Sequence, residues 1–585
     1  MNKFILVILF CLSGFLSYGQ DVEETIKKIK ELPNQDPLTV NGSLNASSVF
    51  YKAYGIKPRR DPFYWVINAN ITFSIYNKIT IPFSATFTQQ DKNFTNGLDK
   101  FSQPFNQFGL SPRYKWLTVH AGYRVMNFSE YTYSGTMFLG GGVEIKPEKS
   151  LVSGEAFYGR LVKAVPTGGI DGVVVSLPAY KRMGGGAKVV LGTQENNVDL
   201  IFFKAKDDKF SIPFDTSLTV TPGENQVLGI GTRQKIGKLV SVEGDFAYSM
   251  YTDNLFQDVT RIEGFTYVNQ IYAIRPSSSF NKAMNAGINF NPVNNYRLGF
   301  KYKRIDPDYR TMGAIFLVND VEEYSINNNL SLIKNKLNVS ASVGIQHNNL
   351  DKLQSQTSRR VIGSLNTTYK FTEQFNAGVN YSNFSSNTIP VRLGLSDTIK
   401  LLQLTQSGGL MSNFSFGKEN IRHNLNFNSN YQESGGNKQE TTSNAMAAVN
   451  YSMLFQKEAL NVTAGIMVNE SKSVGMITQS YGPTLALTKA FLNKKLKITA
   501  SCNYQIANSG GKNVFNNLVA IAGANYTISK WISCKVDYNL LNRESHIANS
   551  PGFTETRFNI SVIGNFNAGV KQFMKNRNNG GQNQK

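Results

Sequence analysis

The sequence predicts an all-β protein: a large antiparallel transmembrane β-barrel of about 26 strands, 24 being the alternative count, with short periplasmic turns and long extracellular loops. Three observations predict it. Apolar and polar residues alternate along most of the chain, as in strands with one apolar face. Many alternating segments run roughly 12 to 15 residues, against about 5 or 6 in globular strands. Tight turns alternate with longer connections, as in bacterial outer-membrane barrels.

Composition narrows the class before any single element is considered. Of the 585 residues, 41% are hydrophobic, 12% aromatic and 17% charged, whereas soluble proteins carry about 25% charged residues. The aromatic content excludes a disordered chain, and the 49 glycines argue against a helical bundle. Mean hydropathy is −0.26, and the only long apolar run lies near the N-terminus, so no helical membrane span is expected in the body.

The first residues predict export. Residues 1–19 have the pattern of a cleaved signal peptide: a basic start, an apolar stretch and small residues at Ser17 and Gly19. Phe10 before Cys11 argues against a lipoprotein signal. Residues 20–38 form the expected periplasmic N-terminal segment, in which Asp21–Leu32 predicts a short amphipathic helix, a frayed tail being the alternative.

The barrel is expected over residues 39–570. Its first strand is predicted near Thr39–Tyr51 and its last near Thr554–Asn567, which places both chain ends in the periplasm. The segments 103–113 and 400–416 are the least regular of the predicted strands. Residues 571–585, rich in Asn and Gly and basic, predict a disordered tail.

On the barrel interpretation, apolar residues face lipid and polar residues face the lumen, because the bilayer interior cannot satisfy polar groups. Two interpretations of the lumen charges are open: an electropositive lumen that attracts anionic solutes or an acidic partner, or charges that pair across neighbouring strands without selectivity. We favour pairing, since acids are available. The charged residues assigned to the lumen are Arg182, Lys188, Glu243, Asp245, Arg297, Lys301, Lys303, Lys497, Lys535 and Asp537.

We expect no enzymatic activity, no cofactor, no metal site and no nucleic-acid partner. The net charge of +21 is carried to a large extent by lysines at turns. Two mature cysteines and four scattered histidines give no metal-site spacing. The acidic residues within 306–323 are interpreted as a solvated loop, a calcium site being the alternative. The glycine triplets 140–142 and 184–186 predict curvature or close backbone approach.

Three short segments carry a resemblance. The signal end Tyr18-Gly19-Gln20, the segment Pro104–Pro112 and the segment Arg304–Arg310 resemble a family of uncharacterised outer-membrane barrels from Bacteroidota. The resemblance implies an outer-membrane location and a barrel over the mature chain, and it transfers no functional residue. Large barrels of that phylum serve uptake, assembly or export machines, which is an analogy only.

A barrel of about 26 strands encloses a lumen too wide for wall side chains to fill, and the segment before the first strand is too short for a plug domain. Loops, the N-terminal helix or a partner protein must occlude it. We therefore expect a barrel that conducts or translocates a solute or polymer, its lumen closed by loops or a partner. The alternative is a non-conducting structural or assembly subunit. Expected partners are outer-membrane lipid and a periplasmic or surface lipoprotein.

Overall fold

The structure is a computed structural model that describes residues 36–89, 106–166, 168–170, 173–176, 178–213, 220–261, 266–314, 317–354, 356–390, 401–436, 439–548 and 550–569. The predicted signal peptide, the helix over 21–32 and the tail over 571–585 lie outside the described residues. Among those described, no helix is both long and apolar enough to cross a membrane.

The described chain is built almost entirely of strands. The 27 strands of the main sheet are β1 (Leu38–Tyr54), β2 (Phe63–Ile75), β3 (Ile79–Thr88), β4 (Gln107–Leu110), β5 (Arg113–Tyr114), β6 (Leu117–Val125), β7 (Met137–Ile145), β8 (Val152–Val162), β11 (Arg182–Gly192), β12 (Asn197–Asp207), β13 (Glu224–Ile236), β14 (Val240–Thr252), β15 (Ser278–Val293), β16 (Tyr296–Ile305), β17 (Val321–Leu332), β18 (Leu337–His347), β19 (Gln356–Lys370), β20 (Phe375–Pro390), β21 (Leu401–Lys418), β22 (Ile421–Gly436), β23 (Gln439–Phe455), β24 (Leu460–Ser473), β25 (Met476–Phe491), β26 (Leu496–Ser509), β27 (Lys512–Thr527), β28 (Ile532–Ser545) and β29 (Phe553–Gly569). A separate hairpin joins β9 (Gly168–Ile170) to β10 (Val173–Ser176), and α3 spans Thr266–Ile271.

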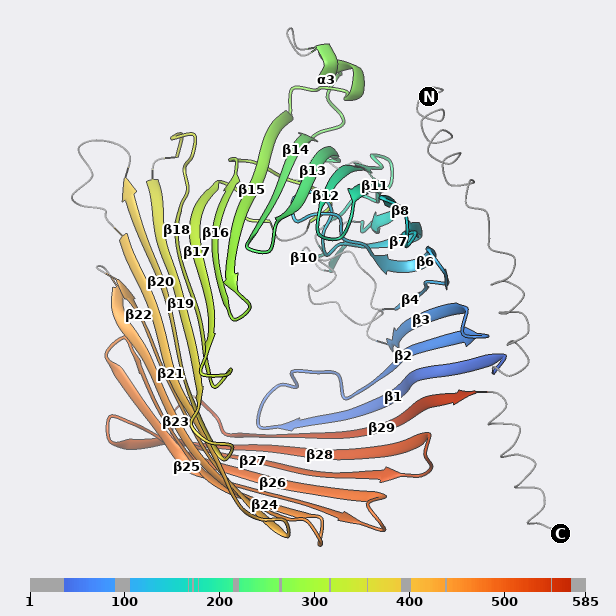
Figure 1. The fold of residues 1–585 in the computed structure, drawn as a ribbon. Coiled ribbons are helices and arrows are strands. Elements are labelled where there is room, and N and C mark those ends of the chain that lie inside the picture. The colour runs from blue at the N-terminus through green and yellow to red at the C-terminus, as the bar shows by residue number, and fades with distance from the viewer. Residues whose placement is uncertain are drawn as a thin grey trace, which may run out of the picture.

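The sheet closes on itself. Neighbouring strands pair antiparallel in chain order, and β1 pairs with β29 from Thr39↔Gly569 to Tyr54↔Thr554; the blue and red strands lie side by side in Figure 1. Both β4 and β5 lie between β3 and β6, so they share one position and the barrel has 26. The predicted fold class and strand count are therefore confirmed. The irregular segment is one strand interrupted next to Pro112, which lacks the N–H that a ladder needs.

The wall differs in height around the barrel. Strands β19 to β29 have 14 to 18 residues, whereas the strands from β4 to β12 that belong to the wall have 2 to 11. The tall wall is the yellow-to-red part of Figure 1. The uncertain segment near 400–416 is an unbroken strand, β21.

The connections follow the predicted alternation in the first two thirds of the chain only. Long connections occupy 163–181, 208–223, 253–277 and 306–320. On the same side of the barrel, however, only two residues separate β22 from β23, β24 from β25, and β26 from β27. Two of these hairpins turn through glycine with positive φ, Gly475 at 72° and Gly510 at 57°, which tight hairpin turns require. The expectation of long loops throughout was therefore wrong for this part.

An aromatic row marks the turn end of the outer face. Seven rings contact one another in sequence with centroids 4.4 to 6.1 Å apart, namely Tyr369, Phe371, Phe375, Phe414, Phe416, His423 and Tyr451. Lys530 Nζ lies 4.8 Å from the ring centre of Trp531 in another turn at this end. Aromatic rings beside basic residues at strand ends are typical of a membrane–water interface.

Candidate functional site: two loops folded into the barrel

The connection between β6 and β7, residues 126–136, folds against the inner face of the wall. We call it the first inner loop. The ring of its Tyr133 lies 4.3 Å from that of Phe157 on β8. The next residue on β8, Tyr158, points to the opposite face and is 64% exposed there. Because successive strand side chains alternate between faces, Phe157 faces the lumen, and so the first inner loop lies inside the barrel.

The connection between β16 and β17, residues 306–320, supplies the second inner loop. It bonds to the first in three places that lie far apart in the sequence. Tyr309 Oη donates to the Tyr131 carbonyl at 2.6 Å, Thr311 Oγ1 donates to the Thr132 carbonyl at 2.8 Å, and Thr136 Oγ1 donates to the Gly313 carbonyl at 2.8 Å. The two loops therefore form one hydrogen-bonded unit within the lumen.

Apolar side chains from the two loops and the inner wall form a single buried cluster, which we call the inner cluster. Its members are Met126, Phe128, Tyr131, Tyr133, Phe138, Phe157, Leu161, Ile201, Phe203, Ala205, Val227, Ala247, Ala283, Ile305, Tyr309, Met312 and Val321. The prediction that polar residues face the lumen is wrong for this part of the wall. The loops cover it, and a covered wall gains stability by burying apolar side chains.

Glycines of β11 make the approach of the first inner loop possible. A Cβ added at Gly186 would lie 2.7 Å from Cε2 of Phe128, and one added at Gly184 would lie 2.6 Å from Cδ1 of Leu161. Both distances are shorter than van der Waals contact, so any larger residue would displace the neighbouring ring or side chain. The predicted close approach at the glycine triplet 184–186 is thereby confirmed, although what approaches is a side chain as well as backbone.

Polar contacts hold the first part of the first inner loop, residues 128–130, against the wall. Lys303 Nζ lies 2.6 Å from a carboxylate oxygen of Glu130. Lys188 Nζ donates to the Phe128 carbonyl at 3.2 Å while it lies 2.9 Å from the carboxylate of Asp199. Two lysines of the wall therefore anchor the loop as well as neutralise acids.

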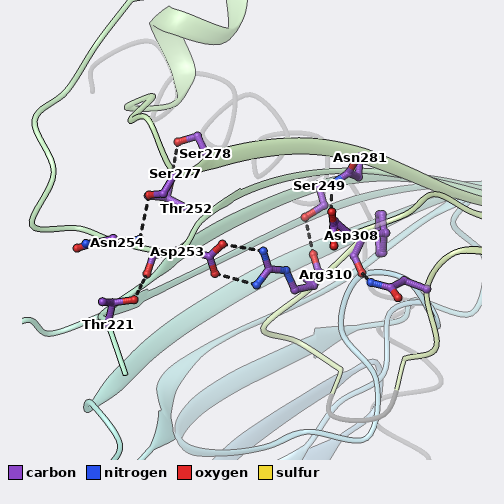
Figure 2. Close-up of polar contacts among 12 residues, drawn as sticks. Thr221, Ser249, Thr252, Asp253, Asn254, Ser277, Ser278, Asn281, Asp308 and Arg310 are labelled. Atoms are coloured by element: carbon purple, nitrogen blue, oxygen red, sulfur yellow. Dashed lines mark hydrogen bonds and ion pairs between the residues drawn. The ribbon is translucent and has the colours of Figure 1, made fainter. Parts of the chain in front are cut away.

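A bidentate ion pair fastens the second inner loop to the connection that follows β14. The guanidinium of Arg310 contacts the Asp253 carboxylate at 2.8 and 2.7 Å, as Figure 2 shows. Ser249 Oγ donates to the Arg310 carbonyl at 2.6 Å, and the guanidinium lies 4.5 Å from the ring centre of Tyr251. We call this set the rim latch.

The titratable groups of the two loops are shifted by their surroundings. Burial raises the pKa of the phenols of Tyr131, Tyr133 and Tyr309. The pKa of Arg310 is also raised, chiefly by its hydrogen bonds to Asp253. At neutral pH the cluster therefore holds three uncharged phenols, and the guanidinium of Arg310 is charged.

Because successive strand side chains alternate between faces, the ten charged residues predicted for the lumen are expected next to outward residues of their strands. Lys301 and Lys497, for example, adjoin Phe300 and Ile498, which are exposed on the outer face. Five of the ten lie in ion pairs, namely Arg182 with Asp207, Lys188 with Asp199, Lys303 with Glu130, and Lys535 with Asp537, at 2.6 to 2.9 Å. Among the described residues, Glu243, Asp245, Arg297, Lys301 and Lys497 form no such pair.

The acidic segment near residue 306 is structural. Asp320 is 7% exposed, and its carboxylate accepts hydrogen bonds from the N–H groups of Asn349 and Leu350 at 2.8 and 2.9 Å. It thus holds the β18–β19 connection in place, so the interpretation as a solvated loop is wrong for Asp320, whereas Asp308 is exposed. In the part of the chain that the structure describes, no group of three or more His, Cys, Asp or Glu residues is placed to hold a metal ion.

Sequence reasoning missed a serine–histidine–glutamate row. Ser111 Oγ lies 2.8 Å from Nδ1 of the buried His120, whose Nε2 lies 2.9 Å from a Glu144 oxygen. Acyl transfer also needs an oxyanion donor. Here the Ser111 N–H is bonded to the Pro82 carbonyl at 2.9 Å, and the following Pro112 has no N–H. Glu144 is further held by Lys146 at 2.6 Å. These side chains therefore form a hydrogen-bond network that stabilises the lumen wall.

The other half of the lumen is lined differently. Inward positions on β18 to β21 carry small hydroxyls that pair across strands, such as Ser342 with Ser364 at 2.7 Å and Ser382 with Ser407 at 2.6 Å. Within the described residues, β20 to β28 make extensive contacts only with their neighbouring strands. This half of the lumen wall is thus polar, weakly charged and uncovered by the described loops.

Comparisons with known proteins identify no family. No family model matches the chain, and no curated protein does. The siderophore receptor PirA of Pseudomonas aeruginosa matches with a TM-score of 0.38 at 9% identity over 90% of this chain and 80% of that one. The FrpB iron transporter of Neisseria meningitidis matches at 0.32 and 10% over 89% and 81%. OpdK of Pseudomonas aeruginosa, solved with vanillate, matches at 0.30 and 10% over 59% and 92%. The resemblance to Bacteroidota barrels stays a prediction.

Proposed function

We propose that the chain is an outer-membrane barrel that conducts small polar solutes through the hydroxyl-lined half of its lumen, while the two inner loops fill the other half. The observation that carries the proposal is this division of the interior. A barrel of this strand number has an interior wider than wall side chains can fill, and the inner cluster accounts for only one side of it.

The lining indicates the class of solute. Serine, threonine and asparagine on the uncovered wall offer hydrogen bonds without strong charge, and half of the predicted lumen charges are neutralised by partners. Arg297, Lys301 and Lys497 have no ion-pair partner among the described residues, and neither do the acids Glu243 and Asp245, which lie on β14, two strands from Lys301 on β16. This near balance favours neutral or weakly anionic solutes and only modest ion selectivity.

The outer-membrane location belongs to the proposal. It is supported by the outward apolar face, the aromatic row at the turn end and the predicted signal peptide at residues 1–19. A periplasmic or surface lipoprotein as an additional closing partner is retained within the proposal, since the described loops leave part of the lumen wall uncovered.

Single-channel recording in planar bilayers tests the proposal. The full-length mature protein should conduct, and replacing residues 129–135 with a Gly-Ser-Gly linker should raise the conductance at least twofold by emptying the covered half. The matched control replaces α3, whose segment packs on the outer face through Tyr272 and Met250, and should leave the conductance unchanged. If neither the wild type nor the loop variant conducts, the proposal fails and a structural subunit is the better assignment.

A further inference from the structure

A groove of about 720 Å³ opens at the loop ends of β8, β11 and β12. On its floor, Gly185 pairs with Tyr158 of β8 on one side and Lys204 of β12 on the other. Gly185 faces outward, since its neighbours Gly184 and Gly186 face the inner cluster. The absent side chain makes room for the Tyr158 ring, whose Cδ2 would lie 2.9 Å from a Cβ added at Gly185.

The groove lies where the outer face changes from apolar to charged. Along β12 the outward residues are Leu200 and Phe202, exposed at 47% and 38%, and then Lys204 and Lys206. On β13 the outward face changes at the same level, because Lys206 pairs in register with Glu224. A change from apolar to charged residues on adjacent strands is expected at the boundary between acyl chains and head groups.

The rim of the groove has an excess of positive charge. The Glu224 carboxylate serves two lysines at once, with Nζ of Lys204 at 3.1 Å and Nζ of Lys206 at 3.2 Å. Lys209 and Arg275 also line the groove, and no carboxylate of a described residue lies within ion-pair distance of either. Of the two acids that line the groove, Asp207 and Asp208, Asp207 is bound to Arg182. Four cations therefore face Glu224 and the exposed Asp208.

The apolar part of the groove suits an acyl chain. Tyr158 is 64% exposed and Phe210 81% exposed; both line the groove, and Tyr158 pairs in register with Gly185. In a bilayer these rings contact lipid and not water. Since Phe202 is the outward residue of β12 that precedes Lys204 and Lys206, the groove matches an amphiphile whose negative charge sits directly at its apolar end.

We propose that this groove binds a membrane lipid with a phosphate head group, the phosphate at Lys204 and Lys206 and an acyl chain along Tyr158, Gly185 and Phe202. A free phosphate ion would use the lysines but not the apolar floor. A partner peptide would have to displace lipid from a surface at acyl-chain depth. The charge complementarity and the depth together favour the lipid.

Native mass spectrometry of the full-length protein released from detergent tests this. The probes are phosphatidic acid, phosphatidylcholine with the same acyl chains, and inorganic phosphate. We expect one retained phosphatidic acid per chain, with an apparent affinity about tenfold above that of phosphatidylcholine, and no retention of inorganic phosphate. Equal retention of the two lipids, or retention of phosphate alone, would overturn the proposal.

Variants locate the site. Lys204→Gln with Lys206→Gln should lower phosphatidic acid retention about tenfold. Because that change leaves the buried Glu224 without its lysines, a triple variant that adds Glu224→Gln keeps the fold and should show the same loss. Lys235→Gln with Lys238→Gln, at the turn end of the neighbouring hairpin, is the control and should retain the lipid. If the triple variant retains it as well, the lipid binds elsewhere and the assignment is wrong.

Discussion

At Gly186 a single missing side chain decides whether the first inner loop can enter the barrel. The sequence contains the triplet 184–186, and glycine within a strand predicts a close approach. The identity of the approaching group could not be predicted, because Phe128 lies 58 positions earlier in the chain. The two meet because the Phe128 ring packs on Phe157 of β8, and Phe157 pairs in register with Gly186.

Tyr133 is the residue on which the inner cluster depends most directly. Its ring contacts Phe157 at 4.3 Å and Phe203 at 5.4 Å, and its hydroxyl donates to the Thr136 carbonyl at 2.6 Å. Tyr133→Ala should destabilise the loop by about 3 to 5 kcal/mol, as aromatic truncations in cores do, without unfolding the wall. Limited chymotrypsin digestion followed by mass analysis should then show cleavage within 126–136.

The exposed Tyr267 on α3, at 85% exposure, gives the control substitution for this experiment. Tyr267→Ala should leave the digestion pattern within the first inner loop unchanged. An uncleaved loop in Tyr133→Ala would mean that the hydrogen bonds between the two loops are sufficient to hold it.

The serine–histidine–glutamate row gives a prediction about chemistry. Ser111 lacks a backbone oxyanion donor, and the Arg124 guanidinium that lines the same pocket already donates to Ser84 Oγ and the Pro82 carbonyl, leaving only its Nε without a partner among the described residues. We therefore expect no covalent labelling of Ser111 by a fluorophosphonate. Labelling that Ser111→Ala abolishes would establish a reactive serine and contradict the expectation of a non-enzyme.

At the scale of elements, the strands could be predicted and the loops could not. A strand in a membrane wall must present one apolar face, so its two-residue period is visible in the local sequence. The inner loops depend on partners that are distant in the sequence. The segment after Val125 continues the alternation of apolar and polar residues, so it resembles a strand. A signal was nevertheless available, since Phe128, Tyr131 and Tyr133 are three aromatic residues in a connection that no lipid-facing strand requires. Such residues in a loop predict a buried surface elsewhere.

The rim latch joins two elements that sequence reasoning treated separately. Arg310 and Asp253 are both about two-fifths exposed, so solvent screening limits the pair to about 0.5 to 1 kcal/mol. Arg310→Gln should therefore raise hydrogen exchange two- to fivefold within 306–314 and leave the strands unchanged. The measurement is exchange followed by mass spectrometry at peptide resolution.

The reversed pair, Arg310→Asp with Asp253→Arg, is the informative comparison for the latch. It restores opposite charges but loses the contact of the guanidinium with Tyr251, so exchange should return at least halfway to the wild-type value. Exchange as fast as in the single variant would mean that the ring contact, and not the ion pair, holds the loop.

In the whole molecule, the lumen wall is divided into two different halves, which the amino-acid composition does not reveal. The same two-residue alternation runs through both halves, yet one inner face is buried and apolar and the other is bare and polar. The long connections lie in the half that is covered, and the tight hairpins lie beside the bare half. The wide lumen expected of 26 strands is therefore narrowed from one side by the barrel's own loops.

Alkaline pH should release the inner loops from the wall, because the inner cluster stabilises its phenols in their uncharged form. Burial raises the pKa of Tyr131, Tyr133 and Tyr309 above the ordinary value of 10.0. A released loop would ionise near that value and the packed loop only above it. The packed state therefore keeps its full stability below pH 10 and loses it as pH rises further, by up to about 1.4 kcal/mol per pH unit for each phenol.

Conductance recorded from pH 8 to 11 should accordingly be constant to about pH 10 and then increase, while the circular dichroism of the barrel stays unchanged. The triple variant Tyr131→Phe, Tyr133→Phe and Tyr309→Phe removes the ionisable groups and keeps the rings, so its conductance should stay flat across the range. An increase of the same size in that variant would assign the pH response to groups outside the cluster. It would also remove the argument that the packed phenols control how far the lumen is filled.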